Sequence, residues 1–204
     1  LETILPIATL TDTPQNPSTS TSARFEFSPS RTQATLECSL DGQAFAACTS
    51  PRVYGSLSQG PHTFAVRAKD AAGTGPPTSF AWVIDSVGPT AAITQTPGNP
   101  TSSRSATFAF SANEAGSFAC ELDGLGFGPC GSPASYQGLG DGMHTFTVKP
   151  TDSLGNPGAS ASFSWRVDGT TPETTLTSAP AVRTTTVSAT FTFSASEPSG
   201  FECK

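Results

Sequence analysis

Apolar and polar residues alternate along short segments of this chain. In Ala-Arg-Phe-Glu-Phe-Ser (23–28), Phe25 and Phe27 fall on one face and charged side chains on the other. A period of two is typical of a half-buried β-strand, whereas apolar positions on a helix recur every three or four residues. The pattern predicts strands within the first half of the chain near residues 8–11, 23–28, 35–40, 44–48, 53–57, 62–69 and 78–84.

The predicted strands are short and are separated by turn residues, such as the Asp-Gly pairs at 41–42 and 123–124. No segment has the helical periodicity over ten or more residues that a parallel α/β fold needs between its strands. The sequence therefore predicts an all-β fold, built from tandem immunoglobulin-like or fibronectin III-like β-sandwich repeats of about seven strands each. Alternation in the strand at 62–69 places Phe64 and Val66 on the core face.

The chain repeats itself at a regular interval. Phe25, Phe108 and Phe191 are evenly spaced and occupy the same place in three copies of Ala-x-Phe-x-Phe-Ser, and Trp82 and Trp165 have the same spacing. Between these anchors the spacing is shorter by one position, for Cys38 and Cys120 and for His62 and His144. A single deletion is therefore expected around 29–33, and a compensating insertion between 73 and 80.

The repeat divides the chain into three parts. We expect one full repeat at residues 5–87, a second at 88–170, and a truncated third at 171–204. A sandwich cannot close on the first few of its strands, so we expect the third part to be poorly supported by packing. On this interpretation the sequence is a piece of a longer protein.

Each full repeat contains two cysteines in the same frame, with an Asp-Gly turn between them. The turn folds each cysteine back towards its mate, which predicts the disulfides Cys38–Cys48 and Cys120–Cys130 and leaves Cys203 unpaired by truncation. Two thiols per repeat lack the other two ligands of a structural zinc site. Local disulfides imply an oxidising compartment.

Charge excludes several classes of partner. With 10 Lys and Arg against 16 Asp and Glu, the formal charge is −6, so no basic patch is available for nucleic acid or anionic membrane surfaces. Apolar stretches are far shorter than the roughly 20 residues that span a bilayer, so this segment predicts no membrane insertion. The 14 Phe and 2 Trp, most of them in alternating runs, disfavour a disordered mucin-like stalk.

Several motifs stand in a fixed order in each repeat. They include Phe-x-Phe-Ser, Glu-Cys-Ser-Leu-Asp-Gly at 37–42 with Cys-Glu-Leu-Asp-Gly at 120–124, and His-Thr-Phe at 62–64 and 144–146. Over essentially the whole chain this order resembles the Ig-like repeats of large bacterial extracellular and surface proteins. The resemblance implies secretion by a bacterium, a role as spacer or adhesive modules, and no enzymatic activity.

The two histidines, His62 and His144, recur in frame at the start of a strand. A catalytic histidine belongs to one unique site, whereas a residue copied into every repeat belongs to the scaffold, so we expect both to fix a turn. Trp82 and Trp165 could stack on sugar rings, but their place in the last strand favours the core. We expect no catalytic residue and no cofactor.

Acidic residues stand near the predicted repeat junctions at Asp70, Asp85, Asp152 and Asp168. Calcium prefers six to eight oxygen ligands, and the sequence shows no dense acidic cluster at either junction. We therefore expect turn and capping roles and no metal. The glycines at 124, 126 and 128 resemble a phosphate loop, but no helical pattern follows them.

Together these features predict a non-catalytic structural or adhesive segment, a spacer or stalk, outside the cell or on its surface. Its partners would be the neighbouring repeats of the same chain, joined by short Pro-containing linkers at 87–89 and 169–172. The alternative is an accessory carbohydrate-binding or attachment module of an extracellular enzyme. Any polysaccharide or protein ligand is unidentified.

Overall fold

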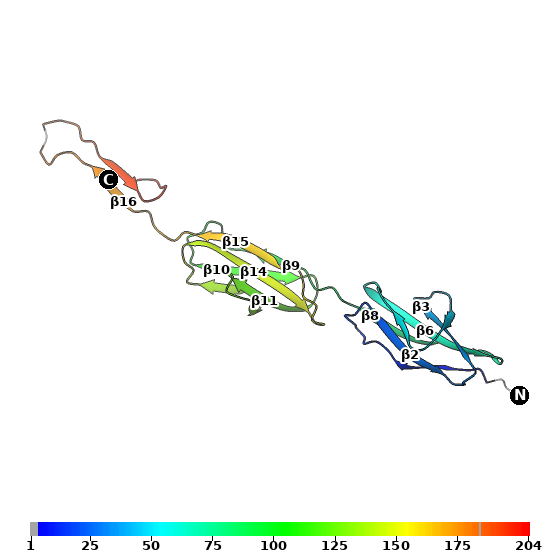
Figure 1. Ribbon diagram of the computed structural model, residues 1–204. Helices are drawn as coiled ribbons and strands as arrows, with labels where there is room; N and C mark the ends of the chain where they lie inside the picture. The colour runs from blue at the N-terminus through cyan, green and yellow to red at the C-terminus, as the bar shows by residue number, and fades with distance from the viewer. Residues whose placement is uncertain (1–3, 184) are drawn as a thin grey trace.

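A computed structural model describes residues 4–183 and 185–204, and over these ranges the chain forms strands and no helix (Figure 1). Residues 8–84 fold into two antiparallel sheets. Their strands are, in order, β1 (Ala8–Asp12), β2 (Ala23–Pro29), β3 (Thr35–Leu40), β4 (Ala46–Cys48), β5 (Arg52–Tyr54), β6 (Gly60–Asp70), β7 (Gly73–Thr74) and β8 (Thr78–Ile84).

One sheet of this first sandwich has the order β1-β2-β5; in the other, β3 lies between β4 and β6, and β6 also pairs with β7 and β8. Side chains from the two sheets meet in the core. Phe25 of β2 stacks on Phe64 of β6 with ring centroids 4.1 Å apart, and Trp82 of β8 packs edge-on to Phe25 at 5.2 Å. The arrangement is a β-sandwich, as the sequence predicts.

The second sandwich repeats the first. Its sheets have the orders β13-β10-β9 and β12-β11-β14-β15, and Phe108 stacks on Phe146 at 4.1 Å with Trp165 at 5.1 Å. The strands are β9 (Ala91–Gln95), β10 (Ser105–Ala112), β11 (Gly116–Leu122), β12 (Gly128–Cys130), β13 (Ala134–Gln137), β14 (Gly142–Asp152) and β15 (Ala161–Val167).

All seven strands predicted for the first repeat are present, and Phe64 and Val66 are fully buried, which confirms the predicted faces. The segment expected at 53–57 is shorter and ends at Tyr54, because the chain turns at Ser56, whose φ is +56°. The very short strand β7 was not predicted, since such a segment has no periodicity to detect.

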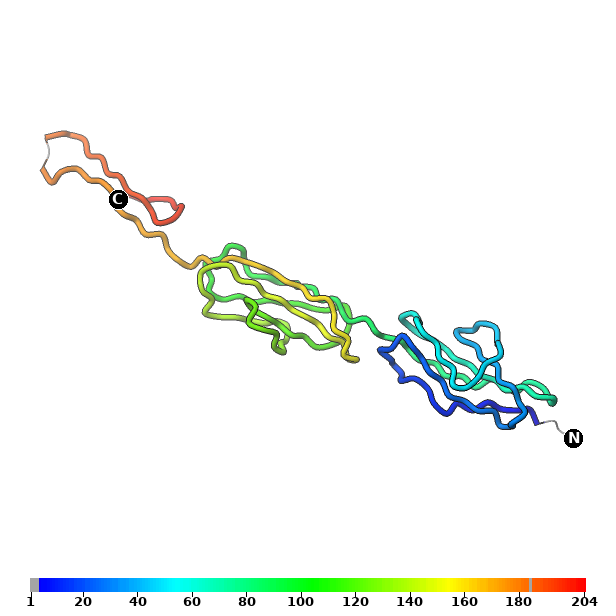
Figure 2. Tube along the Cα trace, viewed as in Figure 1, coloured from blue at the N-terminus to red at the C-terminus, as the bar shows by residue number. Residues whose placement is uncertain are grey.

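Two separate hydrophobic clusters form the cores, one drawn from residues 8–84 and the other from residues 91–167. The sandwiches follow one another along a single line, joined by a short connection (Figure 2). Each cluster falls inside one expected repeat, 5–87 or 88–170. The boundaries themselves stay predictions.

The last part contains a two-stranded antiparallel sheet, β16 (Thr174–Ser178) with β17 (Thr192–Ala195). Phe191 is 55% exposed, whereas its counterparts Phe25 and Phe108 are fully buried. Phe193 contacts Phe201 at 4.6 Å, but both rings stay partly exposed. The described residues of this part form no second sheet over these side chains.

Candidate functional site

A histidine joins three segments at one end of the first sandwich. His62 lies near the start of β6, where the β3–β4 turn and the loop before β6 meet. Its Nδ1 lies 2.8 Å from Oδ2 of Asp41, and its Nε2 lies 2.8 Å from the carbonyl oxygen of Ser58. The ring packs on Trp82 with centroids 5.4 Å apart. We call this arrangement the histidine clamp.

The clamp favours the protonated form of the ring. Both partners are acceptors, so each ring nitrogen must donate, and only imidazolium carries two N–H groups. The Ser58 carbonyl chiefly raises the pKa of His62, burial opposes the rise, and the Asp41 carboxylate adds to it. Burial acts to raise the pKa of Asp41, but hydrogen bonds from Thr63 N and His62 outweigh it, so this pKa is lowered and the carboxylate is ionised.

The second sandwich contains the same clamp. His144 Nδ1 lies 2.7 Å from Oδ2 of Asp123, its Nε2 lies 2.9 Å from the carbonyl oxygen of Gly140, and its ring packs on Trp165 at 5.5 Å. The Gly140 carbonyl and the Asp123 side chain raise the pKa of His144 against the effect of burial.

The side chains of the first clamp resemble a hydrolase triad. In the first sandwich the Ser58 hydroxyl lies 3.5 Å from His62 Nε2, which gives a Ser-His-Asp sequence of side chains. When the ring is protonated, that nitrogen donates to the Ser58 carbonyl, so the charged ring cannot accept a proton from a nucleophile. In the second sandwich Gly140 replaces Ser58, so no hydroxyl is present there.

Ser58 and Gly140, whose carbonyls bind the histidine rings, are each followed by a residue that contacts the segment leaving the sandwich. We call this segment the connection. Gln59 donates from Nε2 to Oδ1 of Asp85 at 2.9 Å and accepts from the backbone N–H of Ser86 at 3.1 Å. Asp141 accepts from the backbone N–H of Gly169 at 2.9 Å. Ser86 and Gly169 have the same spacing as Trp82 and Trp165, so they occupy the same place in the repeat.

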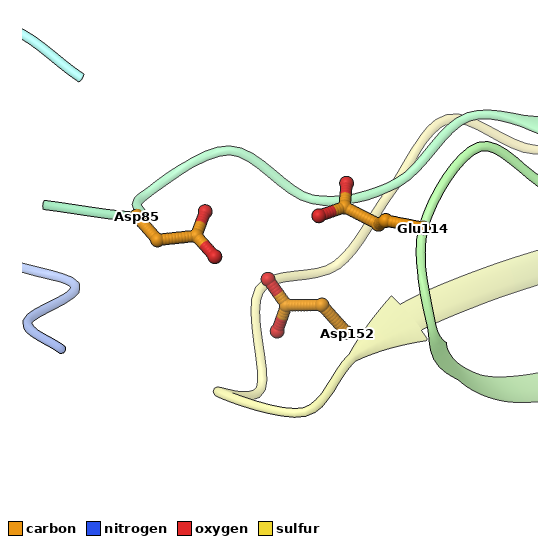
Figure 3. A group of neighbouring side chains, drawn as sticks. All are labelled: Asp85, Glu114 and Asp152. Atoms are coloured by element: carbon orange, nitrogen blue, oxygen red, sulfur yellow. The ribbon is translucent and has the colours of Figure 1, made fainter. Parts of the chain in front are cut away.

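Three carboxylates meet between the first and second sandwiches (Figure 3). Oxygen atoms of Asp85, Glu114 and Asp152 lie within 4.8 Å of one another. Asp152 is 7% exposed, and its Oδ1 accepts from the backbone N–H groups of Leu154 and Asn156 at 2.8 Å each. Asp152 therefore caps a turn, as predicted, in addition to facing the two other acids.

The expectation that no dense acidic cluster stands at a junction was wrong for this junction. Glu114 was missed because it comes from the loop between β10 and β11, far along the chain from Asp85. The sequence did contain a signal for this cluster, because Asp85 and Glu114 recur one repeat later as Asp168 and Glu197. Asp168 and Glu197 also line one cavity. The expected absence of a metal stays a prediction.

Arg31 occupies the place of Glu114 in the first sandwich, one repeat earlier. Its guanidinium lies 2.8 Å from Oδ2 of Asp70, the counterpart of Asp152. The first sandwich therefore neutralises the acid at this end, whereas the second presents another carboxylate to it.

The structure joins Cys38 to Cys48 and Cys120 to Cys130, with Cα atoms 5.8 and 5.7 Å apart, while Cys203 is free and exposed. Each bridge links neighbouring strands across an Asp-Gly turn in which both residues have positive φ. The glycines at 124, 126 and 128 lie in the second of these hairpins, and Gly128 begins strand β12, not a helix.

The tryptophans are not available to a ligand, because Trp82 is 1% exposed and Trp165 is fully buried. The exposed apolar side chains of the second disulfide hairpin are Leu125, at 85%, and Phe127, at 49%. In the first hairpin the guanidinium of Arg67 lies 4.1 Å from the ring centre of Phe45 and covers it.

No protein-family model matches this chain, and no curated protein matches it significantly. Among solved structures, it is similar to the fibronectin(III)-like modules of Clostridium thermocellum CbhA (15% identity, 79% of this chain and 94% of that one, TM-score 0.35). It is also similar to the central fibronectin-III array of RIM-binding protein (15% identity, 87% and 76%, TM-score 0.32) and to the FN1-FN3 domains of chicken CNTN1 (12% identity, 79% and 68%, TM-score 0.35). With scores this low, the β-sandwich assignment rests on the strand pairing and the two cores described above. Over the described residues no helix is long and apolar enough to cross a bilayer.

Proposed function

We propose that this chain is a non-catalytic spacer or stalk, with an adhesive surface role, in a secreted or surface-attached bacterial protein. The observation that carries the proposal is the serial arrangement of two sandwiches with the same core and the same clamp (Figure 2). Units that each close their own core and are joined by short connections add length without needing a ligand.

The residues that could be mistaken for catalytic or ligand-binding groups support the same function. The histidine rings are held between acceptors of the scaffold, and the tryptophans fill the cores. The disulfide in each sandwich fits an oxidising compartment, and therefore a place outside the cell.

Small-angle scattering of the whole chain with Cys203→Ser tests the proposal. We expect an elongated monomer whose maximum dimension does not change with protein concentration. The substitution prevents intermolecular disulfides at the exposed thiol from imitating an assembly. A compact particle would contradict the spacer function, because the two sandwiches would then fold back on each other.

Exposure of Phe127 and Leu125 favours a second candidate, an accessory carbohydrate-binding module. A pull-down with insoluble cellulose, chitin and peptidoglycan separates the two functions. A spacer is not retained by any of them. Retention that Phe127→Ala abolishes, while Phe45→Ala leaves it intact, would establish the second candidate instead.

A further inference from the structure

In both sandwiches the residue whose carbonyl binds the histidine is followed directly along the chain by the residue that contacts the connection leaving the sandwich. Ser58 accepts from the His62 ring, and the next residue, Gln59, accepts from the N–H of Ser86. In the second sandwich Gly140 accepts from His144, and the next residue, Asp141, accepts from the N–H of Gly169.

The side chains that contact the connection differ between the sandwiches, but the geometry is the same. An amide oxygen in one sandwich and a carboxylate oxygen in the other accept from the same backbone position of the repeat, at 3.1 and 2.9 Å. Arg104 and Thr170 also bond to Asp141, so this loop touches both the sandwich and the segment that leaves it.

We propose that each histidine clamp is a protonation-dependent latch that fixes the connection leaving its own sandwich. With the ring charged, its Nδ1–H bonds the aspartate of the hairpin turn and its Nε2–H holds the loop carbonyl, so the following residue is positioned against Ser86 or Gly169. With the ring neutral, one ring nitrogen becomes a lone pair facing an oxygen. That contact becomes repulsive, the loop is released, and the part of the chain that follows moves more freely. This regulation of stiffness goes beyond the spacer function.

Few titratable groups face the rings. Asp41 contacts His62 and Asp123 contacts His144, and the other ring contacts come from carbonyl oxygens, the Ser58 hydroxyl and the tryptophans. Bonds from the Thr170 hydroxyl chiefly lower the pKa of Asp141, so it is ionised throughout the range in which a histidine titrates. The raised pKa of each histidine places release above its ordinary value of 6.5.

Amide NMR of the whole chain with Cys203→Ser tests the latch between about pH 5.5 and 8.5. We expect the Ser86 amide to titrate with the midpoint of the His62 ring, and the Gly169 amide with that of His144. Faster local motion of each connection should appear above that midpoint. A Gly169 amide that stays unchanged while His144 titrates would overturn the proposal, as would a histidine midpoint at or below 6.5.

Substitutions in the second sandwich use the first as a control in the same molecule. His144→Gln should abolish the titration of Gly169 and leave that of Ser86. If this variant fails to fold, Asp141→Ala keeps the clamp and removes the link. In Asp141→Ala, His144 should titrate as before and Gly169 should not follow it. A Gly169 amide that still titrates with His144 in Asp141→Ala would show that the coupling does not pass through this loop.

Discussion

At the scale of single residues, the same side chain at the same place in the repeat has different environments. Phe25 and Phe108 are fully buried, because Phe64 and Phe146 of the opposite sheet stack on them. Phe191 has no such partner among the described residues and is 55% exposed. The energetic contribution of these phenylalanines therefore depends on the facing strand and not on the motif that contains them.

Substituting these phenylalanines should show the difference. Phe108→Ala removes a ring from a closed core and should destabilise the second sandwich by about 3 to 5 kcal/mol. In urea unfolding followed separately for each sandwich, the first should be nearly unaffected. Phe191→Ala is the matched control and should leave both transitions in place. Equal loss in both sandwiches on Phe108→Ala would show that they unfold as one cooperative unit.

The histidine clamps predict a dependence of stability on pH. The pKa of each histidine is raised on folding, so the native state binds protons more tightly than the unfolded chain. This contribution is complete below the ordinary value of 6.5 and is lost as pH rises through the native pKa. The urea midpoint of each sandwich should therefore fall as the pH rises from 6.5 through the native pKa of its histidine. His62→Gln should flatten this slope for the first sandwich alone; a midpoint that rises over the range would contradict the assignment.

At the scale of elements, the disulfide hairpins combine a tight turn with a covalent bond. Asp41 and Gly42 have φ of +51° and +73°, and Asp123 and Gly124 have +55° and +74°. These values fit the two-residue hairpin turn that Asp-Gly favours. The same aspartates accept from the histidine rings, so each hairpin is fixed to its sandwich at the turn as well as along its strands.

Non-reducing peptide mapping should recover Cys38 with Cys48 and Cys120 with Cys130. Breaking one bridge by paired Cys→Ala substitution should cost about 2.7 kcal/mol, the entropy of closing a loop of about eleven residues. The loss should appear in the sandwich that contains the substituted pair. A linkage between the two, such as Cys38 with Cys120, would overturn the expected repeat boundaries.

Strands and faces could be predicted because each depends on neighbours along the chain. Alternation placed Phe64 and Val66 in the core, and the Asp-Gly pairs marked the hairpins. The candidate sites could not be predicted in the same way. The acceptors of His62 include a backbone carbonyl, which has no sequence signature, and Glu114 reaches Asp85 only after both sandwiches have folded.

At the scale of the whole molecule, the first junction combines attraction and repulsion. Asn156 of the second sandwich donates from Nδ2 to the carbonyl oxygen of Asp85 at 2.9 Å and to Oδ2 of Asp152 at 2.7 Å. Burial acts to raise the pKa of Asp152, but hydrogen bonds from Asn156 and from N–H groups of its turn outweigh it, so this pKa is lowered and the group is ionised. Glu114 adds a further carboxylate, so the contact carries like charges that dissolved salt can screen.

Replacing the acid that comes from the β10–β11 loop should relieve this repulsion. Glu114→Gln keeps the size of the side chain and removes its charge, so we expect the second sandwich to melt about 1 to 4 °C higher at low salt. The gain should shrink as sodium chloride approaches about 0.5 M, because the Debye length falls to a few ångströms. Glu173→Gln, at an exposed carboxylate outside the cluster, should produce no such gain.

Calcium added at matched ionic strength tests the expectation that this junction binds no metal. Three carboxylates offer six oxygens at most, and both oxygens of Asp152 already accept hydrogen bonds, so we expect calcium to raise the melting temperature no more than sodium does. Scattering by the whole chain should likewise keep its maximum dimension in millimolar calcium. A saturable calcium-dependent rise, or a change in length, that Glu114→Gln abolishes would show that the three acids hold an ion between the sandwiches.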